Sequence, residues 1–259
     1  MRNTFDELPK TFLENPIAHR GFHDCNGLKK NGNGPENSRE SINAASALGF
    51  GIEIDVRLSK DYVPIVFHDH NLLRLCDLDI NVSDSRSTVL LNARLKNSEP
   101  LPSLEEILYL VNGKVPLLIE IKPGAREQDV GLITRSICVL IENYTGPLAL
   151  MSFDWSLIRA LKFHKPDVPR GLVSQFFEKS TGLLSSDHEK LGISELSLLS
   201  HGASFISHSC ANLSEELYVR NFEQNRKLLT WTVHSQEMAD RVSQKCDNIT
   251  FEGFVPGNY

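Results

Sequence analysis

Two apolar stretches of the sequence carry charged residues at every second position. Glu53 and Asp55 alternate with isoleucines in the first stretch, and Glu120 and Lys122 flank Ile121 in the second. Because successive side chains of a β-strand point to opposite faces, each stretch would gather its charged side chains on one face if it forms a strand. Three carboxylates that meet in one interior raise each other's pKa values unless a cation lies among them.

The chemistry of these acids suits a hard cation. An all-oxygen ligand set from Glu53, Asp55 and Glu120 fits Mg²⁺ or Ca²⁺ and does not fit zinc, which prefers nitrogen and sulfur. The alternative is a structural cluster without a metal, in which Lys122 offsets part of the negative charge. The spacing alone leaves both interpretations open.

Two histidines follow further apolar stretches. His19 and His68 each close a short apolar run, at the point where a strand would end. Two imidazoles beside a metal could act as general acid and general base near neutral pH. Arg20, next to His19, offers the planar fork that binds two oxygens of a phosphate. Each histidine could equally be an ordinary polar residue at a strand end, so these predicted roles depend on the fold.

Three further residues have both a structural and a functional interpretation. Glu36 lies in a turn at a helix start, and the same turn could place it near the site. Asp154 is predicted to cap a helix. Trp231 lies in a predicted strand, where it could form the wall of a substrate pocket or pack in the core.

The elements that must position these side chains alternate along the chain. Eight short apolar stretches rich in β-branched residues are predicted to be strands: 16–19, 50–56, 116–122, 147–152, 171–174, 204–207, 227–233 and 248–252. Six amphipathic stretches are predicted to be helices: 38–48, 104–111, 127–144, 155–164, 215–224 and 236–245. Polar residues just upstream are predicted to cap five of these helices: Asn37, Ser103, Asp154, Ser214 and Ser235.

This alternation predicts an α/β fold with a parallel sheet. Eight strands in a chain of about 250 residues match the size of a closed (β/α)₈ barrel of the TIM type. A doubly wound open sheet is the alternative, because alternation alone does not show closure. In a barrel, active sites lie at the C-terminal ends of the strands, where His19, His68 and the acidic strands would meet.

One connection is too short for this pattern. Between Arg57 and Ile65 there is no room for a crossover helix, which needs a connection of about a dozen residues or more. Residues 63–68 are therefore predicted to fold back as an antiparallel hairpin after the second strand, which carries His68 over the end of that strand. Residues 69–102 then form an insertion that is predicted to lie over the C-terminal face of the barrel, either as a lid or binding loop or as a surface embellishment.

Length and composition limit the class of protein. The 259 residues carry a net charge of −6 with 41% hydrophobic and 23% charged residues, so we expect one folded domain over residues 1–259 and no disordered chain. The sequence has neither a Lys/Arg-rich block for nucleic acid nor an apolar run of about 18 residues for stable membrane insertion. An acidic N-terminal segment and five cysteines without a CxxC pair, at positions 25, 76, 138, 210 and 246, predict reduced thiols in a cytoplasmic protein.

Eight pieces of the sequence, in collinear order, resemble the glycerophosphodiester phosphodiesterase family, a member of the superfamily of PI-PLC-like phosphodiesterase TIM barrels. The pieces are residues 19–21, 35–38, 53–56, 66–69, 101–106, 120–122, 152–154 and 231–233. The resemblance implies a TIM-type barrel that uses a divalent metal, Mg²⁺ or Ca²⁺, to split glycerophosphodiesters into glycerol 3-phosphate and an alcohol.

The resemblance also implies roles for individual residues. The metal ligands would be Glu53, Asp55 and Glu120, the acid–base pair His19 and His68, and the substrate-binding residues Arg20, Lys122 and Trp231.

The sequence departs from the family at two places. The last strand of the family commonly ends in a Thr-Asp-x-Pro type segment, where residues 249–254 of this chain read Ile-Thr-Phe-Glu-Gly-Phe, and His70 is unusual after His68 and Asp69. The alternatives are a lysophospholipase D or phosphoinositide-type lipase on the same scaffold, and a barrel that binds a phosphorylated ligand without catalysis. We expect a small-molecule substrate as the partner. The sequence leaves open the released alcohol, the nucleophile and the oligomeric state.

Overall fold

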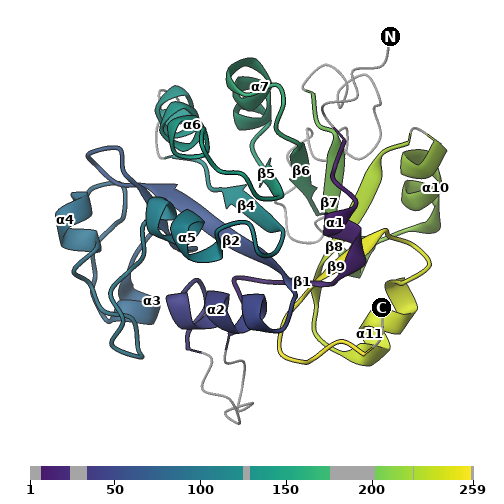
Figure 1. Cartoon of the computed structure of the whole chain (residues 1–259), viewed down its shortest axis with the longest axis horizontal. Helices are drawn as coiled ribbons and strands as arrows, with labels where there is room; N and C mark the ends of the chain where they lie inside the picture. Colours follow the sequence, from purple (N-terminus) through teal and green to yellow (C-terminus); the bar gives the residue numbers. More distant parts are fainter. Residues whose placement is uncertain (1–6, 24–33, 125–128, 176–201, 224, 258–259) are drawn as a thin grey trace, which may run out of the picture.

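Eight parallel strands form a closed barrel at the centre of the protein (Figure 1). The computed structural model describes residues 7–23, 34–124, 129–175, 202–223 and 225–257. The barrel strands are β1 (Ile17–Ala18), β2 (Gly51–Leu58), β4 (Leu117–Ile121), β5 (Leu148–Ser152), β6 (Arg170–Ser174), β7 (Phe205–Ser209), β8 (Lys227–Val233) and β9 (Asn248–Phe251). β1 pairs with β2 on one side and with β9 on the other. The predicted (β/α)₈ barrel is confirmed. The open-sheet alternative is wrong, because the first strand, β1, pairs with the last strand, β9, and so closes the sheet.

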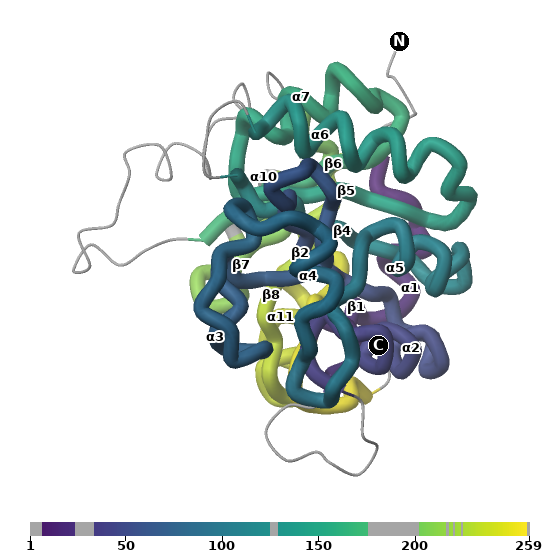
Figure 2. The backbone as a smooth tube through the Cα atoms, turned by 90° about the vertical axis from the view of Figure 1, so that its left-hand side faces the viewer, coloured from purple at the N-terminus to yellow at the C-terminus, as the bar shows by residue number. Residues whose placement is uncertain are grey.

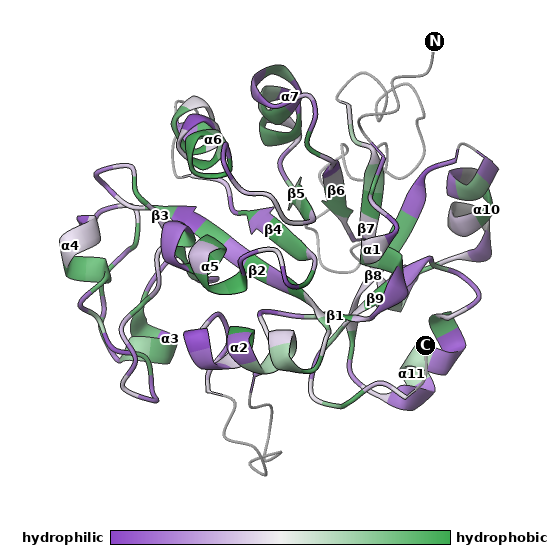
Figure 3. Cartoon of the chain, in the orientation of Figure 1, coloured by the Kyte–Doolittle hydropathy of each residue, from purple (hydrophilic) through white to green (hydrophobic). Residues whose placement is uncertain are grey.

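Helices surround the barrel (Figure 1). They are α1 (Thr11–Glu14), α2 (Arg39–Ala47), α5 (Leu104–Val111), α6 (Asp129–Leu140), α7 (Trp155–His164), α10 (Glu215–Glu223) and α11 (Gln236–Val242), with a 3₁₀ turn at Cys210–Asn212. Figure 3 shows hydrophilic and hydrophobic residues on the same helices, as expected for helices that bury one side. The predicted limits agree to within a few residues, and Glu127 and Gln224 at two of those limits lie outside the described residues.

The helix N-caps show why the helices begin where they do. The predicted caps that the structure confirms are Ser103, Asp154 and Ser235. The prediction of Asn37 as the cap of α2 is wrong, because the Ser38 side chain accepts from the backbone nitrogen of Ser41 at 3.1 Å. Asn37 instead adopts a left-handed backbone, with φ of 57°, and its amide hydrogen-bonds Asp55.

Two apolar cores lie on the two sides of the strands. Inside the barrel, the core consists of Leu8, Phe12, Ile17, Leu118, Ala149, Met151, Val173, Phe205 and Leu229. A larger core between strands and helices includes Ile52 and Ile54 of β2. The alternation along β2 therefore buries its isoleucines against the helices and leaves Glu53 and Asp55 on the interior side.

The predicted hairpin and insertion follow β2. β3 (Pro64–Val66) runs antiparallel to the end of β2, which confirms the hairpin. The insertion contains α3 (Leu73–Cys76) and α4 (Ser87–Leu90), and in Figure 2 it lies on the near side of the molecule, beside α5 and β2. It packs with the hairpin around a small apolar core of its own: Ile65, Phe67, Leu72, Leu75, Val82, Leu90, Ala93, Leu95 and Leu101.

The cysteines and the helix lengths bear on two further expectations. Within the described residues all the cysteines are free thiols, as predicted: Cys76, Cys138, Cys210 and Cys246. Cys25 lies outside the described residues. In the part of the chain that the structure describes, the helices lack the combination of length and apolar character that crossing a membrane requires.

Candidate active site

The three predicted metal ligands meet inside the barrel, on β2 and β4. Asp55 and Glu120 are direct neighbours in the parallel ladder, and Glu53 precedes Asp55 by two residues on β2. One carboxylate oxygen of each residue lies within 4.8 Å of the corresponding oxygens of the other two. All three are buried, with exposed fractions of 1% for Glu53, 1% for Asp55 and 7% for Glu120. The alternation in the sequence therefore does bring three carboxylates together.

Two cations share this interior with the acids. Lys122 Nζ lies 2.8 Å from Asp55 Oδ1 and also pairs with Glu120, and Arg20 Nε lies 3.1 Å from Asp55 Oδ2. Burial acts to raise the pKa of Asp55, but Lys122 and Arg20 outweigh it and lower that pKa. Burial and the neighbouring carboxylates Asp55 and Glu120 raise the pKa of Glu53 well above its ordinary value, and burial also raises the pKa of Glu120. The two cations therefore compensate only part of the negative charge.

The donor set fits a hard divalent cation. Glu53 Oε2 accepts from the backbone nitrogen of Arg20 at 2.9 Å, whereas Glu53 Oε1 is buried and has no hydrogen-bond partner among the described residues. A buried carboxylate oxygen without a partner is unfavourable, and a cation among Glu53, Asp55 and Glu120 would satisfy it. Because Mg²⁺ and Ca²⁺ prefer carboxylate oxygens, these residues fit such an ion.

His19 is held by a carboxylate that follows the last strand. Its Nδ1 lies 2.5 Å from Glu252 Oε2, and its Nε2 lies 4.0 Å from Glu53 Oε2. When the Nδ1–H group donates to Glu252, Nε2 remains as an acceptor on the side of the acids. Burial lowers the pKa of His19, and the hydrogen bond to Glu252 opposes this only in part. Sequence reasoning missed Glu252, although it lies in the segment 249–254 that departs from the family's pattern.

His68 is held by a chain of hydrogen bonds that reaches into the insertion. Its Nδ1 lies 2.7 Å from Asp69 Oδ1, and Asp69 Oδ2 accepts from Arg74 Nε at 2.7 Å. Arg74, in α3, also donates from Nη1 and Nη2 to the two oxygens of Glu36, at 2.8 and 2.7 Å. Burial lowers the pKa of His68. Burial acts to raise the pKa of Asp69, but hydrogen bonds from Arg74 and His68 lower it to about 2.

A tight turn after β1 directs Arg20 toward the acids. Arg20 and Gly21 both have a left-handed backbone, with φ of 55° and 81°. A Cβ at Gly21 would lie 2.6 Å from Ser41 Oγ, so only glycine fits where this turn passes α2. On the other side of the turn, Asn37 Nδ2 donates to Asp55 Oδ2 at 2.9 Å, and the Asp55 backbone nitrogen donates to Asn37 Oδ1 at 3.1 Å. Asn37 and Arg20 together fix the orientation of the Asp55 carboxylate.

A cavity of about 350 Å³ lies next to these groups. Its charged wall includes His19, His68 and Lys122, and its apolar wall includes Phe153 and Trp231. The rings of Phe153 and Trp231 meet edge to face with centroids 5.6 Å apart. The indole nitrogen of Trp231 donates to a backbone carbonyl of β7 at 3.1 Å, which fixes the ring. The arrangement suits a small ligand with one anionic and one less polar part.

All eight residues that the sequence assigns to the site come together. Asp55 lies among the acids, and the other seven line the cavity: His19, Arg20, Glu53, His68, Glu120, Lys122 and Trp231. Sequence reasoning missed Asn37 and Arg74 in addition to Glu252. The suggestion that Glu36 lies near the site is correct, since Glu36 Oε1 accepts from Arg20 Nη1 at 2.8 Å.

Comparison with known proteins identifies the family. Residues 19–251 match the model of the glycerophosphoryl diester phosphodiesterase family. The chain belongs to this family. It is 30% identical over 241 residues to a glycerophosphodiester phosphodiesterase of Caldanaerobacter subterraneus subsp. tengcongensis, an alignment that covers 87% of this chain and 88% of the relative. The family membership makes the protein a phosphoric diester hydrolase, as the resemblance implied.

Solved structures of phosphodiesterases also superpose on this chain. A phosphodiesterase of Oleispira antarctica in complex with the product sn-glycerol-3-phosphate superposes with a TM-score of 0.77 at 21% identity, covering 93% of this chain and 94% of that one. A glycerophosphodiester phosphodiesterase of Thermotoga maritima superposes with a TM-score of 0.68 at 21% identity, covering 92% and 94%. At these identities the likeness shows the TIM-barrel fold.

Proposed function

We propose that the protein hydrolyses glycerophosphodiesters to glycerol 3-phosphate and an alcohol, with a divalent cation and two histidines. The observation that carries the proposal is the meeting of three buried carboxylates with two imidazoles, each paired to a carboxylate, at one cavity. Family membership and the sn-glycerol-3-phosphate bound to the Oleispira antarctica phosphodiesterase support this substrate class.

Glu53, Asp55 and Glu120 would hold the cation. When bound, Mg²⁺ or Ca²⁺ supplies positive charge that polarises a phosphoryl oxygen and lowers the pKa of a nearby hydroxyl group. The chain prepares this site by fixing two of the carboxylates: hydrogen bonds from Asn37 hold Asp55, and the backbone nitrogen of Arg20 holds Glu53.

Arg20 and Lys122 would bind the phosphate oxygens. Arg20 uses Nε for Asp55 and Nη1 for Glu36, and within the described residues its Nη2 has no partner. Lys122 has three donors and pairs with two carboxylates, Asp55 and Glu120. Because both residues line the cavity, their remaining donors can neutralise charge that develops on the phosphoryl oxygens.

The two imidazoles would move the protons. In His19 and His68 a carboxylate holds Nδ1, so each ring keeps Nε2 for the reaction. One imidazole takes the proton of the attacking water or glycerol hydroxyl, and the other gives a proton to the departing alkoxide. Each such step typically contributes on the order of 10²–10⁴ in rate.

Three wider expectations remain predictions. Asp69 and Arg74 connect the insertion, residues 69–102, to His68. The first prediction is that the insertion covers the C-terminal face of the barrel. The second is that residues 1–259 form one domain, and the third is that the protein acts in the cytoplasm on a small-molecule substrate.

The test is the release of glycerol 3-phosphate from defined diesters. The protein is incubated with Mg²⁺ or Ca²⁺ and glycerophosphocholine, glycerophosphoethanolamine or glycerophosphoserine, and the product is measured with a coupled dehydrogenase. We expect turnover that excess EDTA abolishes and added cation restores. Full activity in excess EDTA would remove the cation from the proposal.

Variants separate the histidine roles from the alternatives. We expect His19→Ala and His68→Ala each to lower kcat by about 10² or more, whereas His164→Ala, exposed on α7, serves as the matched control. Turnover of lysophospholipid micelles without turnover of soluble diesters would show a lysophospholipase D or lipase. Binding of glycerol 3-phosphate without turnover of any diester would show a non-catalytic barrel.

A further inference from the structure

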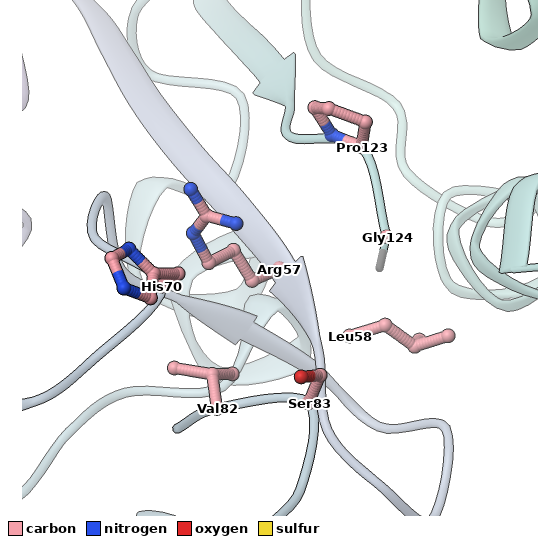
Figure 4. A pocket seen from close by; sticks show the side chains of 7 residues that line it. All are labelled: Arg57, Leu58, His70, Val82, Ser83, Pro123 and Gly124. Atoms are coloured by element: carbon pink, nitrogen blue, oxygen red, sulfur yellow. The ribbon is translucent and has the colours of Figure 1, made fainter. Parts of the chain in front are cut away.

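A second cavity, of about 220 Å³, lies further out along β2 than the active site. Figure 4 shows Arg57 in the middle of this cavity, with His70 on one side and the segment of Pro123 and Gly124 on the other. Ser83 of the insertion also lines it. The lining that the structure describes contains basic and neutral residues and no carboxylate.

The elements that bring catalytic residues to the active site also build this second cavity. Arg57 follows Asp55 by two residues on β2, so it lies on the same face about 6.6 Å further along the strand. His70 follows His68 by two residues, and the chain after β4 continues from Lys122 into Pro123 and Gly124 of the wall. Arg57 Nε donates to the backbone carbonyl of His68 at 2.6 Å. The second cavity therefore lies beside the active site along β2, on the side of His68.

Arg57 brings unused hydrogen-bond donors to this cavity. Its Nε is bonded to a backbone carbonyl, and neither Nη nitrogen has a hydrogen-bond or ion-pair partner in the part of the chain that is described. Three acids act on Arg57 electrostatically, and each is already paired with another cation: Asp55 and Glu120 with Lys122, and Asp69 with Arg74. Burial lowers the pKa of Arg57, but an arginine remains charged at neutral pH.

We propose that the second cavity binds the alcohol part of the substrate when that alcohol carries a second oxyanion, a carboxylate or a phosphate, and that Arg57 is the residue that recognises it. A guanidinium with two free Nη groups can bind two oxygens of one such group. The inference rests on the proposed function, because it places the second arm of the diester. It predicts that glycerophosphoserine is a better substrate than glycerophosphoethanolamine, which differs from it only by the carboxylate.

The experiment compares kcat/KM within two matched pairs of diesters. Glycerophosphoserine is paired with glycerophosphoethanolamine, and glycerophosphoglycerol phosphate with glycerophosphoglycerol, so each pair differs by one anionic group. We expect the anionic member of at least one pair to be preferred about 10-fold or more, as for a hydrogen bond between charged groups. We expect Arg57→Gln to remove this preference by lowering the anionic substrate alone, and Arg57→Lys to keep part of it. Arg94→Gln, at an exposed arginine of the insertion, is the control.

Each result decides the proposal. The pair that responds shows whether the oxyanion is a carboxylate or a phosphate. An equal loss on both members of each pair would overturn the proposal, because it would show that Arg57 acts through the carbonyl of His68. Unchanged kinetics in Arg57→Gln would also overturn it.

A binding measurement separates this inference from the proposed function. Calorimetric titration of the wild type and of Arg57→Gln with glycerophosphoserine and glycerophosphoethanolamine does not depend on turnover. If no diester is hydrolysed, the proposed function fails, while carboxylate binding that Arg57→Gln weakens about 10-fold or more would still support the cavity's role. Equal affinity of the two proteins for glycerophosphoserine would overturn it.

Discussion

Removing the guanidinium of Arg74 would test whether the insertion positions a catalytic histidine. Arg74 lies on α3, makes four hydrogen bonds of 2.7–3.1 Å to Glu36 and Asp69, and reaches His68 only through Asp69. The substitution Arg74→Met keeps an aliphatic stem of similar length and removes every one of these bonds. Asp69 then keeps His68 as a partner but loses the group that fixes its second oxygen.

The magnitude follows from what remains in the variant. The imidazole of His68 is still present, so only its orientation is lost out of the 10²–10⁴ that an acid–base group typically contributes. We expect kcat to fall about 10- to 100-fold, which corresponds to about 1.4–2.7 kcal/mol. KM should change little, because Arg74 lines neither cavity in the described structure. The side chain is 47% exposed, so solvent screens its ion pairs and the free energy of unfolding should fall by only about 1 kcal/mol or less.

The assay combines steady-state kinetics with urea denaturation. Arg94→Met, at an exposed arginine of the same insertion, is the control for the loss of an arginine. A double-mutant cycle with Asp69→Asn distinguishes positioning from general destabilisation. If both residues act through His68, the double variant loses no more activity than the more damaging of the two single variants. Wild-type kcat in Arg74→Met, or strictly additive losses in the cycle, would refute the reasoning.

Two further predictions concern Glu252 and His208. Glu252→Gln should lower kcat by about 10² or more, because an amide can present its NH₂ group to Nδ1 of His19 and favour the wrong tautomer; unchanged turnover with an unchanged circular dichroism spectrum would contradict this. Burial lowers the pKa of His208 from its ordinary value of 6.5 to about 4, so the unfolded chain binds a proton in this range that the folded protein does not. The contribution of His208 to the free energy of unfolding should therefore be fully present above pH 6.5, and up to about 3 kcal/mol of it should be lost as the pH drops to 4. Urea denaturation at pH 7 and pH 5 should show a smaller loss in His208→Gln than in the wild type, and equal losses would contradict the assignment.

Local patterns predict most of the fold, and long-range pairing accounts for the rest. Each barrel strand carries its own apolar run, and each of the six predicted helices its own amphipathic period, so their existence can be derived from neighbouring residues alone. The four-residue helices α1, α3 and α4 were not predicted. Closure cannot, since it depends on Ile17 pairing with both Gly51 and Thr250. The cap of α2 was misassigned for a related reason: Asn37 and Ser38 are both good N-cap residues, and the choice is made by Asp55, which takes the amide of Asn37.

Some residues of the candidate site could likewise be predicted from local patterns, and others could not. Glu53 and Asp55 were predictable because the period of a strand puts them on one face. Glu252 was not, because it is separated from His19 by 233 positions. Arg74 lies only five positions from Asp69, but 38 positions separate it from Glu36. Nothing local marks a carboxylate after the last strand or an arginine in an insertion as the partner of a histidine.

The closing strand shows how the fold and the chemistry depend on each other. The backbone nitrogen of His19 donates to the carbonyl of Phe251 at 2.9 Å, and the next residue, Glu252, holds the side chain of the same histidine. Strand β9 therefore closes the barrel and fixes both the backbone and the imidazole of His19. The segment departs from Thr-Asp-x-Pro, and Glu252 places an acid directly after the strand. It follows that a change that loosens β9 also moves His19 relative to Glu53 and the cavity.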